Sequence, residues 1–163
     1  MVAVAITVDI PFSKKFHVPA PRERVFAYFA DLPSAIPGTF PGIAKFEKTS
    51  ADVYLWEFEP VAHGAHVLAV RFATRYSLVP PVSITLVPAP IPNGKETARL
   101  TGSWRFEEAG GETAVAFESL LQIDLPVPAL MRALVAPLAQ RELGRLFARY
   151  TDKAATAARS ALA

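Results

Sequence analysis

The stretch "FAYFADLPSAIPGTFPGIAKF", residues 26–46, combines helix-forming residues with three prolines spaced four apart. A proline inside a helix removes a backbone hydrogen bond and clashes with the preceding turn, so a helix that runs through Phe29 must stop near Pro33. Pro37 and Pro41 then leave room for only one further turn. The stretch therefore predicts a first helix, a one-turn second helix around residues 34–36 and a strand over residues 43–49.

Upstream of this corner, residues 6–18 alternate between apolar and polar side chains, with Lys14 as the one interruption of the apolar face. A period of two residues indicates a β-strand. Pro21 follows at a position that suits the first residue of a helix. The chain should thus begin with a long strand that leads directly into the first helix.

Downstream, the alternation continues in two hairpins. A three-residue loop at residues 63–65 would pair Trp56 with Phe72 on one face and Glu57 with Arg71 on the other. In the second hairpin, the Gly110–Gly111 turn gives matching apolar or small pairs across the two strands. These pairs are Phe106 with Val115, Trp104 with Phe117, Gly102 with Ser119, and Leu100 with Leu121. A short strand, "VSITLV", precedes a loop, "PAPIPNG".

The C-terminal part, from Pro128 onward, has the period of a helix. Its first apolar stripe contains Leu134 and Leu138, and beyond Pro137 the stripe moves to Phe147 and Tyr150. A proline at the point where the stripe shifts predicts a kink. This helix offers the apolar surface that an antiparallel sheet with one apolar face needs to cover it.

The expected fold class is therefore α+β, with a curved antiparallel sheet of about seven strands around a long C-terminal helix and two short helices after the first strand. A chain of 163 residues with 52% hydrophobic residues is long enough for one domain, which should span residues 1–163. Large aromatic and small residues alternate on the predicted inner face, so the interior could be either partly hollow or filled.

Two segments resemble a known superfamily. "FHVPAPRERVFAYFADL", residues 16–32, resembles the opening strand and the V-x-A-P-x-x-x-V-F helix start of the START/pollen-allergen-like superfamily (SRPBCC, the helix-grip fold). "AIPG", residues 35–38, is similar to the segment after the first helix in two of its groups, the polyketide cyclase/dehydrase-like proteins and the accessory proteins of carbon-monoxide dehydrogenase. The resemblance covers about residues 10–158 and implies that the two short helices form a V that closes one end of a cavity.

The side chains predicted to face this interior are mainly aromatic, with a few polar groups that could orient a ligand. The candidate ligand-binding residues are Tyr54, Trp56, Phe58, His66, Val70, Phe72, Thr74, Tyr76, Trp104, Phe117, Ser119, Leu134 and Leu138. Lys14, Arg141 and Arg145 could add positive charge, and no inward carboxylate is predicted. Such a cavity suits an apolar molecule with a neutral or anionic polar end and disfavours a cation.

Several site types lack support in the sequence. The chain has no cysteine, and His63 and His66 lack a third ligand nearby, so no metal site is predicted. Nucleotide and dinucleotide fingerprints are missing as well, and no cofactor is expected. The net charge is only +2 and the basic residues are scattered, which argues against a nucleic-acid partner. We expect a cytoplasmic protein without a membrane span, although the apolar segment 127–139 could touch a membrane.

The function predicted from these features is binding of a hydrophobic small molecule that is lipid-, polyketide- or terpenoid-like, for carriage or sensing. Two alternatives come from the resemblance. One is an enzyme of the polyketide cyclase/aromatase type, whose catalytic residues the sequence does not identify. The other is a membrane-associated assembly factor. The oligomeric state is left open.

Overall fold

The computed structural model describes residues 6–63 and 66–163, and for residues 61–63 and 66–68 it describes the backbone only. Nine strands, three α-helices and one 3₁₀ turn occupy the described residues. In chain order they are β1 (Ile6–Val18), α1 (Arg22–Ala30), α2 (Leu32–Ala35), β2 (Ile43–Ser50), β3 (Val53–Phe58), β4 (Val61–His63), β5 (His66–Leu68), β6 (Arg71–Val79), β7 (Ser83–Ala89), β8 (Ala98–Ala109), β9 (Glu112–Leu125), η1 (Ala129–Met131) and α3 (Arg132–Ala161).

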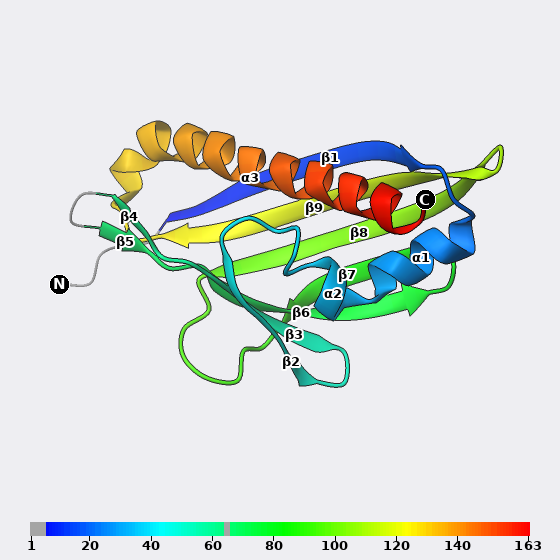
Figure 1. The fold of residues 1–163 in the computed structure, drawn as a ribbon. Helices are drawn as coiled ribbons and strands as arrows, with labels where there is room; N and C mark the ends of the chain where they lie inside the picture. Colours follow the sequence, from blue (N-terminus) through cyan, green and yellow to red (C-terminus); the bar gives the residue numbers. More distant parts are fainter. Residues whose placement is uncertain (1–5, 64–65) are drawn as a thin grey trace.

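Seven strands form one antiparallel sheet in the order β1-β9-β8-β7-β6-β3-β2. The sheet curves, and α3 and the two short helices lie on its concave side (Figure 1). The predicted α+β helix-grip architecture is therefore confirmed. β4 and β5 form a separate two-stranded ribbon that extends from the ends of β3 and β6.

The strand register agrees with the sequence prediction in both long hairpins. Trp104 pairs with Phe117 and Gly102 with Ser119 across β8 and β9. At the connection, Gly110 and Gly111 have φ values of 59° and 87°, the left-handed backbone that a two-residue turn of this type requires. Across β3 and β6, Trp56 pairs with Phe72, as predicted.

Two local predictions were wrong. His63 pairs with His66, so the loop between β4 and β5 contains only residues 64–65 rather than residues 63–65. The pairing register between β4 and β5 is thus shifted by one residue relative to that between β3 and β6. The strand β7 also continues through Pro88, where the sequence predicts a loop. Since β7 pairs with β8 only as far as Leu86, Pro88 has no neighbour on that side, and its missing N–H breaks no hydrogen bond there.

The proline-rich corner forms the predicted pair of short helices, at the end of the sheet where α3 terminates (Figure 1). The aromatic face of α1 packs on β8: the ring centroids of Phe29 and Trp104 are 4.8 Å apart, and those of Phe26 and Phe106 are 5.5 Å apart. After α2, the chain turns through Phe40 towards β2. The prolines end each helix before this turn. The turn then places Phe40 on the concave side of the sheet, against α3.

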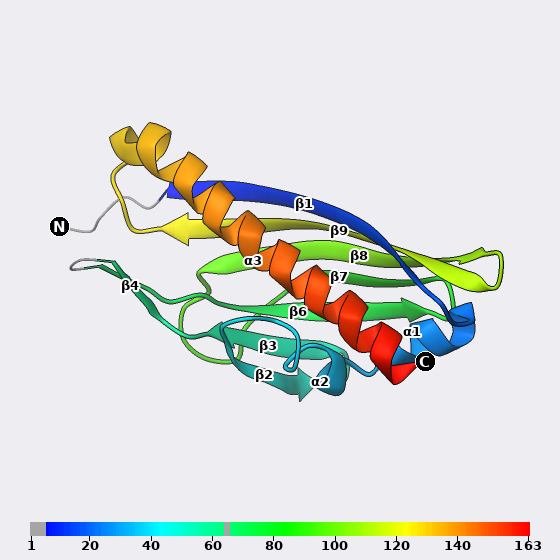
Figure 2. The same cartoon turned by 45° about the horizontal axis from the view of Figure 1, so that its top comes forward.

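The helix α3 crosses the concave face diagonally, from beyond the β1 edge towards α1 (Figure 2). It continues through Pro137 as one helix, and the predicted kink there stays a prediction. The second apolar stripe is buried as expected, with Phe147 only 2% exposed and Tyr150 only 4% exposed. The C-terminal half of α3 is therefore the part that the sheet grips.

Candidate functional site

A cavity of about 140 Å³ lies between α3 and the concave face of the sheet, near the ends of β3 and β6 that lead to the β4–β5 ribbon. Four parts of the fold border it: the α3 helix, the segment after α2, the ends of β3 and β6, and β9. The residues that line it are Phe40, Pro41, Gly42, Phe58, Glu59, Val70, Phe72, Leu121, Leu143, Leu146 and Phe147. We call this space the α3 cavity.

Its lining is almost entirely hydrocarbon. Glu59, an exposed residue just beyond β3, is the one ionisable side chain among the described lining residues. Phe72 stacks on Trp56 with ring centroids 5.4 Å apart, and Phe58 stacks on Phe72 at 6.1 Å. The sheet side of the cavity thus presents two aromatic rings, Phe58 and Phe72, together with the aliphatic side chains of Val70 and Leu121. An apolar molecule would be desolvated here without leaving a polar group of the protein unpaired.

A second, much smaller space of about 10 Å³ lies deeper in the interior, towards α1. It is surrounded by Phe40, Trp56, Tyr76, Leu86, Leu100, Trp104, Phe117, Phe147 and Tyr150. Its volume is close to that of a single water-sized sphere. We call it the inner void. The interior is thus mostly filled by aromatic rings, with open space at one end only.

Seven of the thirteen predicted site residues line one of these two spaces. Phe58, Val70 and Phe72 line the α3 cavity. Four others border the inner void, and they are Trp56, Tyr76, Trp104 and Phe117. Tyr54, Thr74 and Ser119 are buried on the inner face but line neither space. Whether any of these residues binds a ligand stays a prediction.

The expectation that Leu134 and Leu138 share this interior was wrong, because their side chains are 72% and 45% exposed. The first turns of α3 lie beyond the β1 edge of the sheet (Figure 2), and there the helix packs through Val135 and Ala139 instead. His66 belongs to the separate β4–β5 ribbon and not to the seven-stranded sheet. Its side chain, like that of His63, lies outside the described part of the structure.

The cations suggested for the interior lie on the surface. Lys14 forms an ion pair with Asp152 at 3.7 Å, and both side chains are exposed. Arg141 and Arg145 are also exposed, and both contact the carboxylate of Glu142, at 3.5 and 3.3 Å. The predicted preference for an anionic ligand therefore loses the charges on which it was based.

Sequence reasoning missed eight residues that line the α3 cavity. They are Phe40, Pro41, Gly42, Glu59, Leu121, Leu143, Leu146 and Phe147. The shift of the apolar stripe at Pro137 was the available signal for the three on α3, since it already placed them on a separate face. For Phe40, the local sequence shows only that it follows a proline-bounded turn.

Polar chemistry inside the fold is provided mainly by hydroxyl groups. The indole N–H of Trp56 donates to the Thr74 hydroxyl at 2.8 Å. Burial raises the pKa of Tyr76 well above its ordinary value, and it also raises the pKa of Tyr150. Both phenols are therefore neutral near pH 7 and are able to donate or accept hydrogen bonds.

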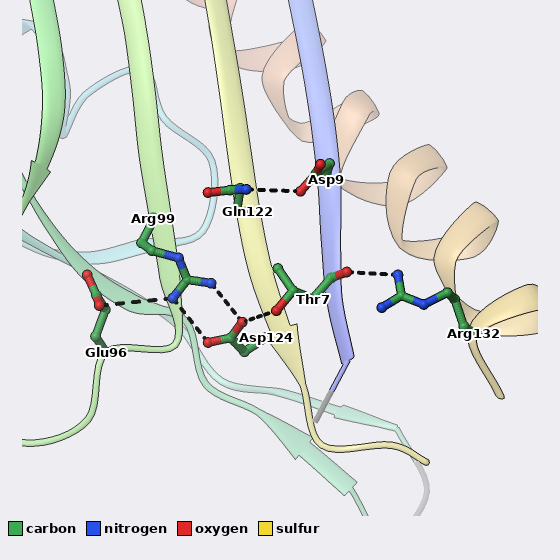
Figure 3. A network of polar contacts seen from close by, with 7 residues as sticks. All are labelled: Thr7, Asp9, Glu96, Arg99, Gln122, Asp124 and Arg132. Carbon is green, nitrogen blue, oxygen red and sulfur yellow. Dashed lines mark hydrogen bonds and ion pairs between the residues drawn. The ribbon is translucent and has the colours of Figure 1, made fainter. Parts of the chain in front are cut away.

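A second polar cluster lies on the outer face of the sheet (Figure 3). Arg99 on β8 donates to both carboxylate oxygens of Asp124 on β9, at 3.1 and 2.7 Å, and Thr7 on β1 donates to Asp124 at 2.7 Å. The hydrogen bond from Arg99 holds the pKa of Asp124 below its ordinary value. Because these residues connect three neighbouring strands and are remote from both interior spaces, we interpret the cluster as a structural clamp.

The clamp predicts a specific pH dependence. A carboxyl group whose pKa is lowered by folding stabilises the native state above its unfolded pKa, and this contribution is lost as the pH falls through the folded value. Replacing Asp124 by Asn should therefore lower the free energy of unfolding by about 1 kcal/mol at pH 7. Urea denaturation of both proteins should show the difference shrinking below about pH 4.

The Asp9→Asn variant is the matched control, since Asp9 on β1 accepts a hydrogen bond from the neutral side chain of Gln122 at 3.2 Å. Its stability should change little at pH 7. A difference between wild type and Asp124→Asn that is constant from pH 7 to below pH 4 would contradict the assignment of the clamp.

Neither a metal site nor a membrane span is found in the part of the chain that the structure describes. No group of three His, Asp or Glu side chains there is arranged to hold a metal ion. None of the described helices combines the length and apolar character needed to cross a bilayer.

No protein-family model and no curated protein sequence matches the chain. Solved structures do match. A conserved protein from Geobacillus kaustophilus superposes with a TM-score of 0.65 at 13% identity, covering 93% of this chain and 96% of the other. A START superfamily protein from Mycobacterium smegmatis gives 0.60 at 16% identity, with 93% and 96% covered.

The polyketide aromatase/cyclases are also similar. The di-domain ARO/CYC StfQ from the steffimycin biosynthetic pathway superposes with a TM-score of 0.62 at 14% identity, and the match covers 94% of this chain and 50% of that protein. At these identities the likeness concerns the arrangement of strands and helices rather than the chemistry. Together with the seven-stranded sheet gripping α3, it shows that this chain has the START-like, helix-grip fold.

Proposed function

We propose that the protein binds a hydrophobic small molecule of lipid-, polyketide- or terpenoid-like character in the α3 cavity, for carriage or sensing. The observation that carries this proposal is the aromatic and aliphatic lining of a space of about 140 Å³. Dry apolar cavities of roughly this size accept molecules as small as benzene. The fold of the START-like neighbours is consistent with a ligand-binding role.

The geometry favours a neutral ligand over a charged one. The described lining residues supply no cation to pair with a carboxylate, and the one carboxylate, Glu59, is exposed at the edge. A charged group placed among Phe58, Phe72 and Phe147 would lose its hydration without compensation. Glu59 is also the one described lining group that could act as a general acid or base, so a cyclase-type reaction has less support than binding.

Three aromatic probes that differ mainly in charge test this proposal. Toluene should raise the thermal unfolding temperature in a saturable manner, because a ligand that binds only the native state stabilises it by mass action. Benzoate and benzylammonium should produce much smaller shifts. No saturable effect of toluene, or tighter binding of either ion, would contradict the proposal.

Two leucine-to-phenylalanine substitutions on α3 locate the binding site. Leu146→Phe should fill the cavity and weaken toluene binding at least about tenfold, since the ligand and the new ring compete for one space. The same change at the exposed Leu134 should leave binding unaltered. Trp56 stacks on Phe72, which lines the cavity, so fluorescence of the Trp104→Phe variant provides a second readout of toluene binding.

A further inference from the structure

The α3 cavity and the inner void share one wall. Phe40 and Phe147 border both spaces. Their rings meet edge to face, with centroids 5.6 Å apart and planes at 82°. These two side chains therefore form the partition between an open apolar space of about 140 Å³ and the deeper interior.

Two tyrosines from two different elements border the inner void on the far side of this partition, and a third lies beside them. Tyr76 of β6 and Tyr150 of α3 border the inner void. Tyr54 of β3 meets Tyr76 edge to face at 5.6 Å. We call Tyr54, Tyr76 and Tyr150 the tyrosine cluster.

We propose that Phe40 and Phe147 are a movable partition, and that the ligand is an elongated neutral molecule whose carbonyl or hydroxyl end passes them to reach Tyr76 and Tyr150. This inference rests on the proposed binding function and adds the direction and the polar end of the ligand. The apolar body would stay in the α3 cavity, between Leu146 and Phe72.

The α3 cavity by itself is small for a ligand site. Sites for small organic ligands usually enclose about 300–1,000 Å³, and the α3 cavity alone encloses about 140 Å³. Displacing two phenylalanine rings from the partition would join the two spaces. Phe40 lies in the turn between Gly38 and Gly42 rather than within a helix or strand, so a shift of its ring would break no helix or strand hydrogen bond.

The chemistry of the closed end selects a neutral polar group. Buried phenols stay protonated, so they can donate a hydrogen bond to a carbonyl or exchange one with a hydroxyl. No cationic or anionic side chain borders the inner void among the described residues. A carboxylate or an ammonium group at this position would therefore be desolvated without a partner of opposite charge.

A matched pair of probes tests the role of the tyrosine cluster. Methyl heptyl ketone and nonane have chains of equal length, and only the ketone has a hydrogen-bond acceptor. Tyr76→Phe and Tyr150→Phe should each weaken ketone binding about three- to tenfold, as expected for one lost hydrogen bond. Nonane binding should not change. Tyr28→Phe is the control, since Tyr28 is half-buried and does not border the void, and it should affect neither probe.

The partition is tested with conservative substitutions. Phe147→Leu and Phe40→Leu remove part of the barrier, so less of the binding energy is used to open it. Each should tighten binding of methyl heptyl ketone at least about threefold relative to that of toluene. Toluene is the reference because it fits the α3 cavity alone, which both phenylalanines also line. If Phe147→Leu does not fold, Phe40→Leu alone decides the result.

The possible outcomes separate the two proposals. Toluene that fails to bind the wild type contradicts the proposed function itself. Toluene that binds, with ketone affinity unaffected by Tyr76→Phe and Tyr150→Phe, overturns the role of the tyrosine cluster. An unchanged or lower affinity for the ketone relative to toluene in the leucine variants overturns the movable partition while leaving the α3 cavity as a binding site.

Discussion

Replacing Trp104 by alanine should lower the free energy of unfolding by about 3–5 kcal/mol, among the largest effects expected for one core substitution. Trp104 is only 4% exposed. Its ring centroid lies 4.4 Å from that of Phe117 and 4.8 Å from that of Phe29, so it connects the sheet to α1. The inner void beside it is too small to relieve the cavity that the substitution creates.

Phe72 provides the contrast for this prediction. It is equally buried, at 2% exposure, but it borders the α3 cavity. The loss in free energy of unfolding caused by Phe72→Ala should therefore be at least about 1 kcal/mol smaller than that caused by Trp104→Ala, since part of the space around Phe72 is already open. Urea denaturation followed by far-ultraviolet circular dichroism measures both. Equal losses of stability at the two positions would contradict the presence of open space beside Phe72.

Replacing Gly102 by valine should destabilise the protein by about 3 kcal/mol, the upper end for overpacking in a core. A Cβ atom at Gly102 would lie 2.8 Å from the carbonyl oxygen of Glu118 and 3.3 Å from the Cβ of Ser119. The first of these atoms belongs to the backbone of β9, which pairs with β8 at this point. It cannot move away without disturbing the ladder between the two strands.

Gly144 is the control for this second prediction. It lies within α3, and a Cβ atom built there meets no atom within 4 Å. Gly144→Ala should therefore stabilise the protein by about 0.5–1 kcal/mol, through the better helix propensity of alanine. Thermal and urea unfolding of both variants test the pair. A mild effect of Gly102→Val would mean that β8 and β9 can separate at this point.

The sequence by itself determined the order of the elements and most of the strand register. Period-two alternation fixes which side chains share a face, and a glycine turn fixes which residues lie opposite each other. The pairing of Trp104 with Phe117 and of Trp56 with Phe72 follows from these local rules. The proline spacing likewise determined the two short helices, because proline acts on its own helical turn.

The position of α3 on the sheet was decided only by the tertiary structure. Leu134 and Phe147 both lie on apolar stripes of one helix, but Leu134 is 72% exposed and Phe147 is 2% exposed. The reason is that the diagonal crossing brings only the later turns of α3 over the concave face (Figure 2). A helical period shows which residues share a face, but it carries no information on how far along its length the helix is covered. The same crossing places Leu143, Leu146 and Phe147 opposite Phe40 and Phe72, and so creates the α3 cavity from residues that are distant in the sequence.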